Sequence, residues 1–219
     1  MDNGDYFYEP AKGHGLPHNP FKAIVAPRPI GWISTRDREG RANLAPYSFF
    51  NAFCDSPPVI AFSSGGRKDS LRNIEETSEF VANFVSRDLA RAMNLTSAPF
   101  AHGTDEMAAV GLAAAPSRIV AVPRVADSPA ALECRLLQIV HLHDLDGRPT
   151  HNYAVFGQVV GVHINRRFLR DGLFDTGEAR PVTRAGYQAD YVAVEPEAMF
   201  QMHRPQTPEE ALAEVAKRR

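Results

Sequence analysis

The sequence predicts a mainly β protein: a single Greek-key barrel domain over residues 1–219, with short helical insertions and a C-terminal helix. Short apolar runs rich in valine, isoleucine and phenylalanine recur along the chain and are separated by turn residues, as is typical of strands. A repeating strand–helix–strand pattern is absent, and so is the Gly-x-Gly-x-x-Gly sequence of dinucleotide-binding domains. With 44% hydrophobic residues, the chain can bury the core that one large domain needs.

The N-terminal part begins with an arm and then supplies closely spaced strands. Residues 1–20 lack periodicity and are rich in glycine, proline and histidine, so we expect them to wrap over the domain or a neighbouring subunit. One strand is expected over residues 23–34, broken at two prolines that cannot donate to a sheet ladder. After a turn at 37–40, residues 43–53 are expected to form the returning strand and residues 59–63 a short buried strand.

Three short helices are expected between the later strands, each opened by a polar side chain that can cap it: residues 70–77 after Asp69 or Ser70, about 88–96 after Ser86, and 104–111 from Thr104. Further strands rich in branched or aromatic side chains are expected at residues 80–85, 132–142 and 154–164. A helix at about 207–219 closes the chain, because Thr207 and Glu210 form a capping box with a proline at the first helical position.

Composition argues against several classes of function. The formal net charge of −2 gives no basic surface of the kind that binds nucleic acid. No apolar run approaches the length of a membrane span, and the acidic N-terminus is unlike a secretory signal. Cys54 and Cys134 lack the spacing of a zinc site or a redox pair, so we expect two buried or half-buried thiols in a protein of the reducing cytoplasm.

Polar and aromatic side chains are interleaved in residues 43–51, which read Asn-Leu-Ala-Pro-Tyr-Ser-Phe-Phe-Asn. A flat heteroaromatic ligand needs hydrogen-bonding groups along one edge and apolar contact along the other, and such a strand end can supply both. Alternatively, the aromatic side chains are simply part of the core. The candidate ligand-binding residues of this segment are Asn43, Ala45, Tyr47, Ser48, Phe49 and Asn51.

A glycine-rich turn leads into the helix expected at 70–77 and carries hydroxyl groups and positive charge, in the order Ser-Ser-Gly-Gly-Arg-Lys-Asp-Ser. Backbone amides that converge at a helix N-terminus favour an anion, so the turn suits a phosphate group. The spacing is not that of a nucleoside-triphosphate loop. A capped turn without a ligand is the alternative. The candidate phosphate-binding residues are Ser63, Ser64, Arg67, Lys68, Asp69 and Ser70.

Two further segments flank these motifs: Ala-Pro-Arg-Pro-Ile-Gly-Trp-Ile-Ser-Thr at 26–35 and Pro-Pro-Val-Ile-Ala-Phe-Ser-Ser at 57–64. With Lys-Asp-Ser-Leu-Arg-Asn-Ile at 68–74, the set resembles the flavin reductase-like family of FMN-binding split barrels. The resemblance covers nearly the whole chain, and it is specific because several separate motifs occur in the family's order. It implies a six-stranded split barrel that binds FMN and forms a homodimer.

The resemblance also implies three further cofactor contacts. Ser34 and Thr35 stand at the strand end that in this family contacts the ribityl chain or phosphate of the flavin. Residues 181–187 resemble the family's Pro-x-x-Arg-x-Gly-Gly-x-Tyr segment, although the tyrosine here follows the glycine directly. Arg184 is therefore a candidate contact to the flavin phosphate or ring, on a motif whose spacing departs from the family pattern.

By resemblance, the protein would be an NAD(P)H-dependent flavin reductase: NAD(P)H donates a hydride to FMN, and the electrons pass to a monooxygenase partner, oxygen or another acceptor. No residue is assigned as a general acid or base, because the cofactor carries such chemistry. Two alternatives remain. One is a non-enzymatic FMN electron carrier of the flavoredoxin type, and the other is an enzyme like pyridoxamine-phosphate oxidase on the same barrel.

Histidines raise a separate question. His141 and His143 are expected on one face of a strand, near Asp144, and could pair on a metal ion. A third ligand is not evident, so the sequence predicts no metal site. His14 and His18 could contact a partner subunit or the cofactor pocket.

Overall fold

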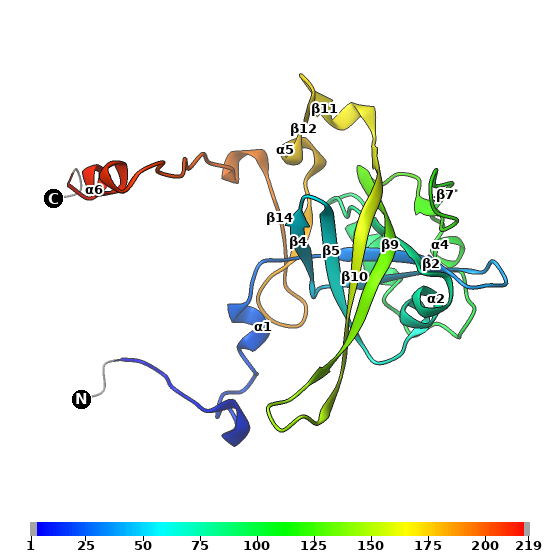
Figure 1. Ribbon diagram of the computed structural model, residues 1–219, viewed down its shortest axis with the longest axis horizontal. Helices are drawn as coiled ribbons and strands as arrows, with labels where there is room; N and C mark the ends of the chain where they lie inside the picture. The colour runs from blue at the N-terminus through cyan, green and yellow to red at the C-terminus, as the bar shows by residue number, and fades with distance from the viewer. Residues whose placement is uncertain (1–3, 217–219) are drawn as a thin grey trace.

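The computed structural model describes residues 4–216 and shows the predicted mainly β fold, built on one large antiparallel sheet (Figure 1). Both the N-terminal arm and the C-terminal segment leave the barrel on the same side of the molecule (Figure 1). In spatial order, the strands of the large sheet are β3 (Ala42–Tyr47), β2 (Gly31–Arg36), β6 (Glu79–Asn83), β9 (Ala130–His143), β10 (Pro149–Ile164), β5 (Pro58–Gly65) and β4 (Phe50–Asp55).

Smaller elements surround this sheet. A three-stranded sheet contains β1 (Arg28–Pro29), β13 (Val182–Arg184) and β14 (Tyr191–Ala193), and two short pairs are β7 (Ala114–Ala115) with β8 (Arg124–Val125) and β11 (Leu169–Arg170) with β12 (Leu173–Phe174). The α-helices are α1 (Phe21–Ile24), α2 (Asp69–Thr77), α3 (Ala90–Leu95), α4 (Glu106–Ala109), α5 (Thr176–Ala179) and α6 (Pro208–Ala216). Single 3₁₀ turns lie at Pro10–Lys12, Arg166–Phe168 and Pro196–Ala198.

The prediction of one broken strand over residues 23–34 is wrong for the first part of that range. Phe21–Ile24 is the short helix α1, and the chain becomes extended only after Pro27. β1 then pairs with β13, not with the large sheet, and β2 begins after it. The prolines explain the separation, because residues on either side of them cannot share one continuous ladder.

The strand expected over residues 43–53 is two strands. β3 pairs with β2 at one edge of the large sheet, whereas β4 pairs with β5 at the other edge. The chain crosses between them in a bend at residues 48–49. Gly31 permits the crossing, because a Cβ atom there would lie only 2.6 Å from the ring of Phe50. This division gives the large sheet seven strands, where the family resemblance implied six.

The four predicted helices correspond to α2, α3, α4 and α6, with differences at their ends, whereas α1 and α5 were not predicted. The cap predicted at Asp69 or Ser70 is wrong, because Lys68 is the N-cap residue of α2 and no side chain caps that helix. Thr104 does not cap α4, because its hydroxyl donates to the carbonyl of Ala101; Asp105 is the cap and accepts from the amide of Ala108 at 3.2 Å. Thr207 caps α6 through the amide of Glu210 at 3.3 Å. The predicted continuation of that helix to residue 219 lies outside the described residues. None of the described helices has the length and apolar character needed to span a membrane.

Three apolar clusters hold the barrel together. Phe62 and Phe80 meet edge to face at 5.7 Å in the main cluster, and Trp32 is the largest side chain of a second cluster beneath α3. Cys134 is buried in the main cluster, whereas Cys54 on the edge strand β4 is exposed. The expectation of two buried or half-buried thiols is therefore wrong for Cys54.

Candidate functional site

A cleft of about 580 Å³ lies between β3, the start of α2 and the loop at residues 96–106. The residues of two separate sequence motifs meet in it, because β3 and the turn before α2 end on the same side of the sheet. The predicted cofactor residues that line the cleft are Asn43, Ala45, Tyr47, Arg67, Lys68, Asp69 and Ser70.

A network of buried amides and hydroxyls forms the floor of the cleft. The Asn43 Nδ2 donates to Ser70 Oγ at 2.9 Å and, at 3.4 Å, to the hydroxyl of Thr35. Asn73 on α2 donates to the same Thr35 oxygen at 3.0 Å. These bonds fasten β2 and β3 to α2 and fix where the helix begins.

The start of α2 presents positive charge to the cleft. No side chain caps this nine-residue helix, so its first backbone amides lack the partner that a cap would provide. Arg67 forms an ion pair with Glu75, whereas Lys68 has no ion pair among residues 4–216. An uncapped helix start beside an unpaired lysine favours a bound anion.

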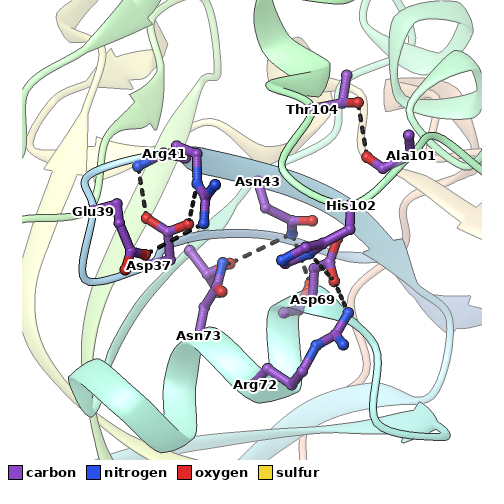
Figure 2. Close-up of polar contacts among 12 residues, drawn as sticks. Asp37, Glu39, Arg41, Asn43, Asp69, Arg72, Asn73, Ala101, His102 and Thr104 are labelled. Carbon is purple, nitrogen blue, oxygen red and sulfur yellow. Dashed lines mark hydrogen bonds and ion pairs between the residues drawn. The ribbon is translucent and has the colours of Figure 1, made fainter.

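The Asp69 carboxylate adds negative charge at the same place, but other groups in the cleft compensate it. Figure 2 shows Arg72 and His102 converging on this carboxylate, with His102 Nδ1 at 2.9 Å. Partial burial would raise the pKa of Asp69, but Arg72 and His102 together lower it below its ordinary value. The carboxylate thus has Arg72 and the His102 ring as partners, and it forms no ion pair with Lys68.

Tyr47 provides an independent sign that the cleft takes a ligand. Its side chain is buried, its ring packs against Phe62 at 4.7 Å, and its hydroxyl has no hydrogen-bond partner among the described residues. Burial raises the pKa of Tyr47, although the nearby hydroxyls of Ser70 and Ser64 act in the opposite direction. A buried hydroxyl without a partner costs free energy, which a polar group of a ligand would recover.

The other predicted residues are divided between the protein interior and two further cavities. Ser34 Oγ donates to the carbonyl of Pro123 at 2.6 Å, and Ser64 Oγ donates to that of Gly66 at 2.9 Å. Both side chains are fully buried, so in this structure they support the strand ends from behind. Ser48, Phe49, Asn51 and Ser63 line a largely apolar cavity of about 310 Å³ beside β4.

A larger cavity, of about 970 Å³, adjoins the cleft through Pro46 and Ser97, which line both. Arg184 and Ser48 line this cavity and not the cleft, so the structure separates Arg184 from Lys68. We call this space the basic cavity, because Lys22, Arg87 and Arg91 line it together with Arg184.

Sequence reasoning missed the loop that closes the cleft, and with it His102 and Glu106. Glu106 accepts from the amide of Leu44 at 2.7 Å, and burial raises the pKa of this carboxyl. No spacing in the sequence links these residues to Asn43 or Lys68, because the contact depends on how residues 84–106 return across β3.

The two histidines on the β9–β10 hairpin are engaged with the hairpin itself. His141 stacks on Tyr153 with ring centroids 4.2 Å apart, and its Nε2 lies 2.7 Å from the carbonyl of Thr150. His143 Nδ1 lies 2.9 Å from the carbonyl of His141. Within residues 4–216, no three histidine, cysteine or acidic side chains come together as a set that could hold a metal ion.

Comparisons of the sequence and of the structure with known proteins agree on the kind of protein that this chain is similar to. The sequence model of the "Flavin reductase like domain" family matches residues 25–183. A protein of uncharacterized function from Deinococcus radiodurans is 41% identical over 181 residues, which are 77% of each chain. Nitrilotriacetate monooxygenase component B from Bacillus cereus has a similar structure, with a TM-score of 0.76 and 26% identity over 85% of this chain and 98% of that one.

Flavoredoxin of Desulfovibrio vulgaris (Miyazaki F) is also similar, with a TM-score of 0.71 and 25% identity over 84% of this chain and 94% of that one. The likeness confirms the mainly β split-barrel fold that the sequence motifs predicted.

Proposed function

Because this chain belongs to the flavin reductase-like family, we propose that it is an FMN-binding oxidoreductase that transfers a hydride from NAD(P)H to the flavin. The electrons would pass to a flavin-dependent monooxygenase partner, to oxygen or to another acceptor. The observation that carries the proposal is the cleft, where Lys68 and the uncapped start of α2 lie together with the Tyr47 hydroxyl. Within residues 4–216, Lys68 has no ion pair and this hydroxyl has no hydrogen-bond partner.

The residues of the cleft fit FMN. Its phosphate needs opposing charge and several hydrogen-bond donors, which Lys68, Ser70 and the first amides of α2 would provide. The polar edge of the ring system needs donors and acceptors, for which Asn43 and Tyr47 are suitable. Bound FMN would supply the redox chemistry, by accepting a hydride and releasing its electrons to an acceptor.

The protein's own part would be to bind and to orient. Pro46 and Ser97 separate the cleft from the basic cavity, so two molecules can occupy adjoining spaces. Holding reactants together in this way lowers the entropic part of the barrier without any acid or base. In this proposal no side chain is assigned a proton-transfer role.

Anaerobic addition of NADH or NADPH to the FMN-loaded protein tests the proposal. We expect flavin absorbance to be lost with at least one nucleotide and to return on admitting air. Absorbance lost with dithionite but with neither nucleotide would identify an electron carrier, as the likeness to flavoredoxin also allows. Failure of the purified protein to bind FMN would contradict both functions.

We further propose a homodimer in the cytoplasm, with the two arms packed on a second copy. Residues 4–20 and 199–216 run away from the barrel (Figure 1). Phe7, Phe200 and Met202 on these segments are exposed. Exposed apolar segments of this size mark contact surfaces. Free thiols at Cys54 and Cys134 favour a reducing compartment. Light scattering at micromolar concentration should give twice the chain mass, and a monomer mass would contradict the proposal.

Replacing His141 or His143 by alanine should have little effect on hydride transfer. Their ring nitrogens face backbone carbonyls of their own hairpin, and neither residue lines the cleft or the basic cavity. The rate of NAD(P)H-dependent flavin reduction should stay within about tenfold of wild type, or ~1.4 kcal/mol of barrier. A loss of several hundredfold in a folded variant would show that a histidine takes part in the reaction.

A further inference from the structure

The basic cavity contains positive charge that no group in the described chain neutralises. Lys22, Arg87, Arg91 and Arg184 line it, and no aspartate or glutamate does. None of these four side chains forms an ion pair with any residue between 4 and 216. In a protein with net charge −2, cationic side chains at the surface ordinarily lie near acidic ones. A cavity lined by four cations and no acidic residue therefore requires an explanation.

A fifth cation, Arg28, lies beside Arg184 and lines the apolar cavity next to β4. The two arginines are register partners on β1 and β13, so their side chains start from adjacent positions of one small sheet. Arg28 is only 5% exposed, and its Nη1 donates to the backbone carbonyls of Lys22 and Val25, with no carboxylate as partner. Burial and the charge of Arg184 lower the pKa of the Arg28 guanidinium.

Both arginines retain unused hydrogen-bonding capacity. The Nε atoms of Arg28 and Arg184 are buried and have no partner among the described residues. The other guanidinium nitrogens of Arg184 donate to Tyr191 Oη and to the carbonyls of Tyr187 and Gln188, which fixes the side chain in the cavity wall. Two like charges with unsatisfied donors are stable side by side when an anion neutralises them.

The remaining wall of the cavity is apolar. Ile30, Met93 and Val182 line it and belong to the buried cluster around Trp32, so this wall is rigid. The ring of Tyr191 lies against the Arg184 guanidinium at 4.7 Å and also lines the cavity. A ligand that suits both walls has an anionic head and a flat apolar body.

We propose that the basic cavity binds a small organic carboxylate, with the carboxylate facing Arg87, Arg91 and Arg184 and the apolar body against Ile30, Met93 and Val182. Arg28 lies beside Arg184 and adds to the positive potential. The proposal rests on the proposed function in one respect: it assigns a chemical class to the electron acceptor that would follow NAD(P)H in the space next to the flavin cleft. Planar guanidinium groups match a carboxylate with two parallel hydrogen bonds, which also explains why arginines predominate over lysines here.

Equilibrium dialysis with benzoate and with benzamide, its neutral counterpart, tests the proposal on FMN-loaded and on flavin-free protein. Benzoate should bind at least about tenfold more tightly than benzamide, because only benzoate carries the charge that the arginines recognise. Arg184→Gln should weaken benzoate about tenfold or more and leave benzamide unchanged. Arg91→Gln, at an exposed position, should weaken benzoate about threefold even if Arg184→Gln does not fold.

Arg148→Gln is the matched control, because Arg148 lies on the far hairpin and pairs with Asp144 and Asp146; it should leave benzoate binding unchanged. Equal binding of benzoate and benzamide, or no saturable binding of either, would overturn the proposal. Parallel losses of benzoate and FMN affinity in Arg184→Gln would place Arg184 in the flavin site and overturn it too. A wild-type protein that binds benzoate but not FMN would refute the proposed function while leaving the carboxylate site standing.

Discussion

Replacing Glu133 by glutamine is expected to lower the free energy of unfolding at pH 7 by about 3 kcal/mol. The Glu133 side chain is 1% exposed and accepts hydrogen bonds from the backbone amides of Arg118, Ile119 and Val120 at 2.8, 2.7 and 2.9 Å. His163 Nε2 lies 2.5 Å from Oε1, the carboxylate oxygen that also accepts from the Arg118 amide. A glutamine keeps the shape but turns one acceptor into a donor that faces other donors, so the loop at 116–123 loses its anchor.

The pH dependence of this loss has a definite sign. Burial would raise the pKa of Glu133, but the Arg118 amide, His163 and the amides of Val120 and Ile119 lower it from 4.5 to about 2. Because the folded pKa is depressed, the stabilisation is fully present above pH 4.5 and is lost as the pH falls toward 2. Urea unfolding of wild type and Glu133→Gln should therefore give stabilities that converge over this range.

Glu76→Gln on the exposed face of α2 is the matched control and should change the free energy of unfolding by less than about 0.5 kcal/mol. A difference between wild type and Glu133→Gln that persists undiminished near pH 2.5 would mean that the carboxylate charge is not the source of the stabilisation.

Replacing Lys68 by alanine is expected to weaken FMN binding roughly ten- to hundredfold, because one charge-assisted hydrogen bond contributes about 1.5–3 kcal/mol. Lys68 is the cation of the cleft that has no ion pair among the described residues, and it stands at the uncapped start of α2. Fluorescence titration of FMN measures the loss directly.

Riboflavin, which lacks the phosphate, separates a phosphate contact from general damage to the cleft. It should bind wild type more weakly than FMN does and respond little to Lys68→Ala. Lys12→Ala is a matched control, because Lys12 pairs with Glu9 on the N-terminal arm, outside the cleft. Equal losses for FMN and riboflavin would place Lys68 elsewhere in the site, and no loss for either would mean that the turn before α2 binds no phosphate.

Local patterns predicted most of the fold, because strands and helices follow from the spacing of apolar residues and from capping side chains. The errors fall where contacts between distant segments decide the outcome. Residues 43–53 have the composition of one strand, and only the close approach of Phe50 to Gly31 shows why the chain divides there. Likewise, β1 exists because β13, more than 150 residues later, pairs with it.

In the candidate site, too, the residues set by local sequence could be predicted, and those set by contacts between distant segments could not. The residues of 43–51 and 63–70 that face the cleft could be found from their chemistry, because hydroxyl, amide and basic groups seldom gather in strand ends without a ligand. His102 and Glu106 could not, since their places depend on the path of a loop. Arg28 lies in the 26–35 segment that carries part of the family resemblance. Its buried position beside Arg184, however, depends on the pairing of β1 with β13 and could not be predicted from that segment.

The order of strands in the large sheet also constrains how the chain folds while it is being synthesised. By the time Asn83 is made, the chain can form only two separate sheet fragments, β3-β2-β6 and β5-β4. The β9–β10 hairpin joins them, since it inserts between β6 and β5 and is complete only at Ile164. Until the ribosome has added that hairpin, β6 and β5 are two further open sheet edges besides β3 and β4. Such edges are the kind of surface that chaperones cover and that aggregates extend.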